Sequence, residues 1–208
     1  RDAEMKLSFL RVCALIFLGA VIVDCRSTVT RTYTKPGLEN AELKYVKRVG
    51  IVVDKASVAP VHADLRDRML SYRTREHLTH HSEYIVYPVK TPGPVVDVCK
   101  ANKKLNGVIL LRVLEEKKVG GDLSLNLMST LLDCKSGDRL WEAEGKRNFE
   151  MNDSDFGTLV SGDVKRFGND ARTYSAPFYR MTGALYEKMP MPELTDSERI
   201  EKIDADAD

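Results

Sequence analysis

The pattern of hydrophobic and polar positions divides the chain after residue 45 into alternating strands and helices. The aliphatic run VGIVV at 49–53 is bounded by charged residues, which predicts a buried strand. Residues 61–81 have apolar positions at helical spacing and predict a helix. A second strand at 83–88 and a second helix at 95–105 follow. The first half of the domain is therefore expected to run β-α-β-α.

Two of the predicted helices have a long apolar stripe. The helix at 61–81 has an apolar stripe at approximately i, i+4 and i+7, while Arg and Asp occupy its other faces. The stripe consists of Leu65, Met69, Tyr72 and Leu78. Residues 170–189 predict the last helix, because apolar side chains recur there at steps of three or four. Pro177 does not fit the interior of that helix, so it either starts the helix at about residue 176 or kinks it.

Between these helices, three strands are predicted in succession. Residues 107–118, 123–133 and 139–149 each have a strand-like apolar pattern, and short turns containing glycine join them. Strands joined in this way form an antiparallel meander. The fold class is therefore α/β: a single domain with a mixed sheet of about five strands in the order β-α-β-α-β-β-β-α, including a three-stranded meander.

Polar segments mark the expected domain boundaries. Residues 25–45 predict a linker, 46–192 the α/β domain, and 193–208 an acidic tail. The tail has seven acidic and two basic residues and is expected to be disordered. Inside the domain, the Asp-, Gly- and Ser-rich stretch 151–169 is expected to be a loop or mobile insertion with at most one helical turn.

The first 24 residues have the order of a secretory leader. Lys6 and Arg11 form a basic region, and residues 12–23 are an unbroken run of twelve apolar residues. That run is shorter than the roughly 20 residues that span a bilayer. Cys25 follows directly, as in a bacterial lipoprotein signal, where this cysteine becomes lipidated (with palmitate among its acyl chains). Residues 1–4 precede the start methionine Met5 and are interpreted as an upstream extension.

One residue departs from the lipoprotein pattern and keeps two alternatives open. Asp24 stands where Gly, Ala or Ser normally precedes the cysteine. A cleaved soluble leader and an uncleaved, short membrane anchor are the other interpretations. With lipidation at Cys25, Arg26 in the following position implies the outer membrane by the sorting rule of enteric bacteria. The expected location is then the outer membrane, with the domain facing the periplasm.

Composition excludes one class of partner and raises one question about cysteines. The chain has 32 basic and 31 acidic residues, and it contains no dense basic run with interleaved aromatic residues, so a nucleic-acid partner is not expected. Two cysteines, Cys99 and Cys134, remain for the folded domain. In an oxidising compartment they can pair, but the sequence alone does not place them within disulfide distance.

Candidate chemistry is sparse. His77, His80 and His81 fall at i, i+3 and i+4 and could offer a metal one helix face, but the charge of this segment and its nearness to the helix C-terminus favour exposed histidines at a polar helix end. The chain has no G-x-S-x-G motif and no phosphate-binding G-x-x-x-x-G-K loop. We therefore expect no enzyme, no cofactor and no metal, with the three histidines as the one weak metal candidate.

The meander contains a hairpin that resembles a known one. Residues 131–145, LLDCKSGDRLWEAEG, are similar to the aliphatic–Asp–x–x–Thr/Ser–Gly–x–x–x–Trp hairpin of a lipoprotein superfamily. That superfamily includes the curli-secretion lipoprotein, the activator lipoproteins of penicillin-binding proteins and the amino-terminal domain of the Tol-Pal translocation protein. Lys47-Arg48 before VGIVV and the segment NGVILLRV are also similar. The resemblance implies protein–protein contacts and assembly in the envelope.

These observations give three hypotheses. The leading one is a membrane-anchored lipoprotein that binds or assembles an envelope protein complex, with a homo-oligomer as a further possibility. Trp141, Asp133 and Gly137 are its candidate interaction surface, together with the segment 151–169. The second is an accessory lipoprotein of an envelope lipid or solute transport system. The third, from another class, is a small envelope hydrolase or metal binder that uses the histidines.

Overall fold

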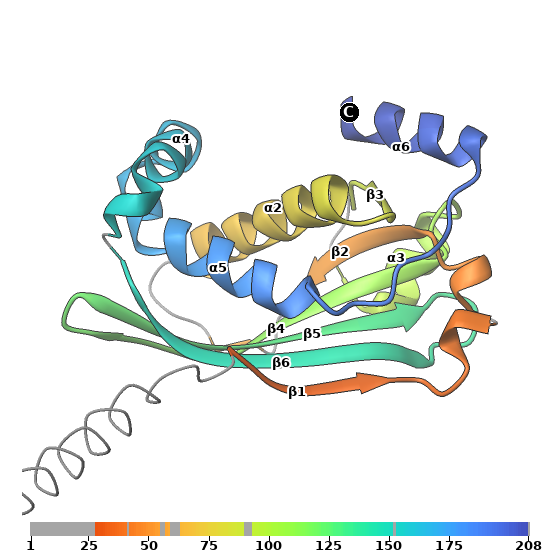
Figure 1. Cartoon of the computed structure of the whole chain (residues 1–208), viewed down its shortest axis with the longest axis horizontal. Helices are drawn as coiled ribbons and strands as arrows, with labels where there is room; N and C mark the ends of the chain where they lie inside the picture. Colours follow the sequence, from red (N-terminus) through yellow and green to blue (C-terminus); the bar gives the residue numbers. More distant parts are fainter. Residues whose placement is uncertain are drawn as a thin grey trace, which may run out of the picture.

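A six-stranded mixed sheet organises the domain (Figure 1). The computed structural model describes residues 28–40, 42–54, 57–58, 63–89, 93–151 and 153–207. The leader and the lipidation candidate Cys25 lie outside these residues. The strands are β1 (Val29–Thr34), β2 (Arg48–Val53), β3 (Ile85–Tyr87), β4 (Gly107–Val119), β5 (Asp122–Asp133) and β6 (Arg139–Glu150).

The sheet joins a parallel half to an antiparallel half. Its strand order is β1-β6-β5-β4-β2-β3. Strand β2 pairs in parallel with both β3 and β4, and the meander β4-β5-β6 is antiparallel throughout. This confirms the predicted α/β class and the three-stranded meander. The sheet has six strands, one more than the expected five.

Helices cover the two faces of the sheet unequally. The α-helices are α2 (Ala63–His81), α3 (Val95–Ala101), α4 (Gly157–Phe167), α5 (Ser175–Tyr186) and α6 (Asp196–Ala207). Helices α2 and α5 lie side by side over one face (Figure 1), and their apolar side chains form the main core with alternate residues of the strands. Helix α3 packs on the opposite face, against Val52 and Val108. Among the described helices, none has both the length and the apolarity that spanning a bilayer requires.

The predicted linker contains the sixth strand. Residues 29–34 form β1, which pairs antiparallel with β6, and two 3₁₀ turns follow at Leu38–Asn40 and Glu42–Lys44. Leu38 and Leu43 are buried in the main core. The expectation of a free linker over 25–45 was wrong because β1 is an edge strand with polar, exposed side chains. Its sequence lacks the apolar alternation of a strand that has one buried face.

The segment 151–169 is also more ordered than expected. It contains an 11-residue helix, α4, in place of a loop with a single turn. Asp163 of α4 forms an ion pair with Arg73 of α2 at 2.5 Å, and both side chains are 3% exposed. Phe167 packs edge-on against Tyr72, with ring centroids 5.5 Å apart. The helix is fixed by these contacts with α2, which lies far away in the sequence.

Helix α2 buries two arginines that the periodicity assigned to its polar faces. Leu65, Met69 and Leu78 lie in the core as predicted, but Arg66 and Arg73 are 1% and 3% exposed. Each is neutralised where it is buried. Arg66 pairs with Asp67 and, at 3.4 Å, with Glu116 of β4. A buried charge requires such partners, and those partners cannot be identified from the α2 sequence alone.

Two helices have boundaries that differ from the predicted ones. Helix α3 ends at Ala101, four residues before its predicted end, because Asn102 leaves the helical region with φ −118° and ψ 76°. The Asn102 side chain also donates to the carbonyl of Val98 at 2.9 Å. Helix α5 begins at Ser175 and carries Pro177 in its first turn. The structure therefore favours the interpretation in which this proline starts the last helix.

The acidic tail is a docked helix rather than a disordered segment. Helix α6 packs against β3, and charged groups attach it to β2 and to the residue before β2. Lys47 pairs with Glu198 at 2.8 Å, and Arg48 holds both oxygens of Glu201 at 2.7 and 2.5 Å. Buried apolar contact is confined to a small cluster of Ile85, Leu194 and Ala205, with Tyr87 packed against it. Composition alone predicts disorder for this acidic segment. It cannot reveal the basic partners, which lie about 150 residues earlier in the chain.

The docking of α6 should weaken in acid. Lys47 lowers the pKa of Glu198 from 4.5 to about 2, and Arg48 lowers the pKa of Glu201. A carboxylate whose pKa is depressed by folding stabilises the fold above its unfolded pKa and loses that contribution as the pH falls through its folded pKa. We expect α6 to be ordered at pH 7 and to detach between about pH 4.5 and 2, as measured by ¹⁵N heteronuclear NOEs of residues 196–207. The amides of α5 are the internal control, and an α6 that stays as rigid as α5 at pH 2 would contradict the prediction.

Candidate functional site

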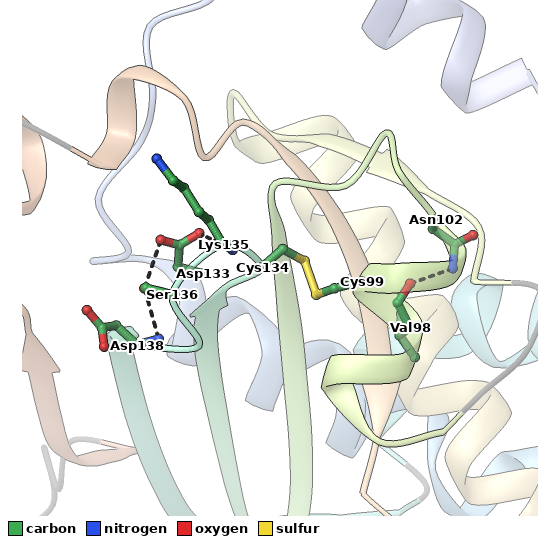
Figure 2. Close-up of a disulfide and its surroundings, with 8 residues drawn as sticks. All are labelled: Val98, Cys99, Asn102, Asp133, Cys134, Lys135, Ser136 and Asp138. Atoms are coloured by element: carbon green, nitrogen blue, oxygen red, sulfur yellow. Dashed lines mark hydrogen bonds between the residues drawn. A yellow bond between two sulfur atoms is a disulfide. The ribbon is translucent and has the colours of Figure 1, made fainter.

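A disulfide connects the meander to helix α3 at one end of the sheet (Figure 2). Cys134 follows the last residue of β5, and Cys99 lies on α3. Their sulfurs are bonded at 2.05 Å, and their Cα atoms are 5.5 Å apart. The pairing that the sequence left open is thus present in the structure. Because α3 is short, this covalent bond fixes its position on the sheet.

Next to the disulfide, Asp133 organises the turn between β5 and β6. Its carboxylate accepts from the Lys135 amide at 2.9 Å and from the Ser136 hydroxyl at 3.0 Å (Figure 2). Gly137 has φ of 77°, a conformation that strongly favours glycine. Asp133 is 2% exposed, so it stabilises the turn from inside and offers almost no surface to a partner. Lys135, Ser136 and Gly137 lie at the surface.

Asp133 also connects the turn to the segment before β2. The Tyr45 hydroxyl donates to its carboxylate at 2.9 Å, and burial together with this carboxylate raises the pKa of Tyr45 to about 12. Nearby, Lys35 forms ion pairs with Glu42 and Asp138 at 2.6 and 3.0 Å. These bonds attach the chain on the amino-terminal side of β2 to the hairpin. The disulfide, the turn and the segment before β2 are therefore connected at this end of the sheet.

Trp141 is a core residue, which corrects its assignment to an interaction surface. Its side chain is 1% exposed and stacks on Tyr186 of α5, with ring centroids 5.8 Å apart. Alternation along β6 places it on the face that α2 and α5 cover. The hairpin motif does not reveal which face of the sheet the helices occupy, so it cannot show whether this large aromatic side chain is exposed.

The exposed part of this end is a shallow groove. Its volume is about 340 Å³, and it lies between α3 and the β5–β6 turn. The residues that line it are Val95, Val96, Cys99, Lys100, Asp133, Cys134, Lys135, Ser136 and Gly137. Val96 is 59% exposed. The groove offers exposed Val96 and two lysines, Lys100 and Lys135, beside the disulfide.

The three histidines at the end of α2 do not form a metal centre. His77 stacks on Tyr186 at 5.8 Å and lies 4.9 Å from the ring of His81, while His80 and His81 are exposed. Burial, and secondarily His81, lowers the pKa of His77, so its imidazole is neutral at pH 7. Within the described part of the chain, no group of three or more His, Cys, Asp or Glu side chains could hold a metal ion.

The comparisons with known proteins give weak similarities of fold. No protein-family model matches the chain, and no curated protein matches it. Similar solved structures include a PelC dodecamer from Paraburkholderia phytofirmans (13% identity, 74% of this chain and 94% of that chain, TM-score 0.44). Another is lipoprotein GNA1162 from Neisseria meningitidis (16% identity, 58% of this chain and 96% of that chain, TM-score 0.41). A third is hypothetical protein CT253 from Chlamydia trachomatis (14% identity, 74% of this chain and 95% of that chain, TM-score 0.39). Function is therefore argued from the chain's own residues.

Replacing Trp141 should destabilise the domain strongly. Truncating a buried tryptophan leaves a cavity and removes its apolar contacts, so Trp141→Ala should lower the free energy of unfolding by about 3–5 kcal/mol. Urea unfolding followed by circular dichroism measures this loss. Val96→Ala, at an exposed position, is the control and should change the stability by less than about 0.5 kcal/mol. A near-neutral Trp141→Ala would mean that this side chain is not in the core.

Removing the disulfide should also destabilise the domain. The bond closes a loop of 35 residues, for which constraint of the unfolded chain contributes about 2–4 kcal/mol. The double variant Cys99→Ala/Cys134→Ala should lose stability of that order in urea unfolding. The parent protein treated with a reductant should lose a comparable amount, whereas the variant should be insensitive to reductant. Reductant-insensitive stability of the parent would show that the bond is not formed.

Proposed function

We propose that this chain is a lipid-anchored, periplasm-facing lipoprotein of the bacterial outer membrane that acts as a non-catalytic binding or assembly factor. The Cys99–Cys134 disulfide carries this proposal. Structural disulfides persist in oxidising compartments and are rare in the cytosol, so the bond favours an exported protein. The order of residues 5–25, a basic region, an apolar run and a cysteine, supports the same location independently.

The rigid end of the sheet is the surface through which we propose that the protein binds. The disulfide fixes α3, and the Asp133 turn fixes the hairpin, so the groove between them keeps its shape without a ligand. Preorganised surfaces lose little conformational entropy on binding. Lys100 and Lys135 border the exposed Val96 there, so the surface is complementary to a protein partner that offers an apolar group and acidic side chains.

A non-catalytic role agrees with the chemistry of this site. The acidic side chain in the groove, Asp133, accepts hydrogen bonds from Tyr45, Lys135 and Ser136 and maintains the turn. A general base would instead need free access to a substrate proton. The neutral, stacked His77 is likewise occupied by packing against Tyr186.

The lipid anchor can be tested in cells. We expect intact mass analysis of the membrane fraction to find a mature chain that begins at a triacylated Cys25. Cys25→Ser should abolish the acylation and release the domain from the membrane. An amino terminus processed without acyl chains would contradict the lipid anchor. A soluble secreted form or an uncleaved leader would then replace it.

The partner can be captured from the same cells. A photo-crosslinking amino acid at Lys135 should trap an envelope protein, identified by mass spectrometry, and the same probe at His80, outside the groove, is the matched control. Recovery of a transporter subunit would favour the accessory transport hypothesis. Equal yields from the two positions would contradict the groove as the binding surface.

A further inference from the structure

The docked helix α6 reveals a second site, on the edge of the sheet opposite β1. Three donors from β2, β3 and the residue before β2 converge on two carboxylates of α6. Lys47 holds Glu198, the guanidinium of Arg48 holds both oxygens of Glu201, and the Tyr87 hydroxyl donates to Glu201 at 2.6 Å. We call these three residues the basic edge site.

The basic edge site is built for carboxylates. A bidentate guanidinium–carboxylate pair fixes both distance and plane, which makes it more specific than a lone lysine contact. Burial and Glu201 raise the pKa of Tyr87 to about 12, so the hydroxyl is protonated and serves as a donor. The lysine is also confined, since its side chain is 11% exposed in the docked state. The site thus presents ordered donors to carboxylates one helical turn apart.

The helix that fills the site is oriented in an unusual way. Its charged residues Glu198 and Glu201 face the domain, whereas Ile200 and Ile203 are 62% and 70% exposed. An amphipathic helix normally buries its apolar stripe against the core. Here the buried apolar contribution from α6 and the segment before it comes from Leu194 and Ala205. Ion pairs of Glu198 and Glu201 therefore hold α6, together with hydrogen bonds from Arg75 to the Ala205 carbonyl and from Lys202 to the Ser82 carbonyl. Ion pairs are weakened by salt and exchange readily for equivalent ones.

We propose that the basic edge site binds an acidic helix of a partner protein, with two carboxylates one turn apart, and that α6 occupies the site in cis until the partner displaces it. This deepens, and rests on, the proposed function as a binding or assembly factor. Charge complementarity identifies the ligand class, because α6 itself shows which side chains fit. A partner that repeats this pattern gains the same contacts, and displacement frees the exposed stripe of α6.

The experiment opens the site in the full chain and supplies the ligand in trans. The variant Glu198→Gln/Glu201→Gln removes the two carboxylates that α6 places in the site. Its matched control, Asp204→Asn/Asp206→Asn, removes the same charge from two exposed positions of the same helix. The probe is a fluorescein-labelled peptide of residues 193–208, and its anisotropy is measured at low salt.

We expect the peptide to bind the Glu198→Gln/Glu201→Gln chain at least about tenfold more tightly than the parent, in which α6 occupies the site. The Asp204→Asn/Asp206→Asn chain should behave like the parent. A peptide with the two glutamines should lose binding, a peptide with the two asparagines should keep it, and added salt should weaken it. Trypsin cleavage at Arg199 should become faster only in the glutamine variant.

Several results would overturn the proposal. Equal binding of the glutamine and asparagine peptides would show that net charge, not a carboxylate site, attracts the probe. An α6 that stays protected from trypsin in the glutamine variant would show that its carboxylates do not hold it. A parent protein that is dimeric, and becomes monomeric in the glutamine variant, would assign the site to a second copy's α6. Each of these failures leaves the lipid anchor and the Lys135 crosslinks unaffected, so the proposed function is tested separately.

Discussion

Burial of one face of the β4–β5–β6 meander is the constraint on which the rest of the domain depends. Alternate residues of β5, from Leu123 to Leu131, are fully buried there, and Trp141 extends the same surface onto β6. Such a surface cannot face water, so α2 and α5 must cover it. The two buried arginines of α2 follow from this requirement, because a helix pressed so closely against strands needs acidic partners for any charge that it carries inward.

Elements with their own apolar pattern could be predicted from sequence. The alternation of Leu123, Leu125 and Leu127 predicts a half-buried strand whatever lies above it, and the stripe of α2 predicts a helix. Elements that depend on distant partners could not be predicted. Strand β1 forms because it pairs with the exposed edge of β6 through backbone hydrogen bonds. Helix α6 docks because Lys47 and Arg48 form ion pairs with its glutamates. Neither dependence leaves a local mark in the sequence.

The candidate site divides along the same line. The sequence predicts a short turn containing glycine between β5 and β6, and the structure has it: Gly137 takes positive φ and Asp133 accepts from the Lys135 amide, since those roles are local. The hairpin motif did not indicate exposure, and Trp141 and Asp133 are buried. Which side of a hairpin meets solvent is decided by helices elsewhere in the chain. The disulfide depended likewise on the distance between α3 and β5, which no spacing of cysteines could supply.

The edge strand β1 has a consequence for how far the protein can act. Val29, its first residue, stands four positions after Cys25, and four extended residues span at most about 14 Å. A lipid on Cys25 would therefore hold the edge of the sheet close to the headgroups, at a much shorter distance than a free segment of twenty residues would allow. Such a protein could contact partners only at the membrane surface. Its partners must be embedded there or bring their own segments down to it.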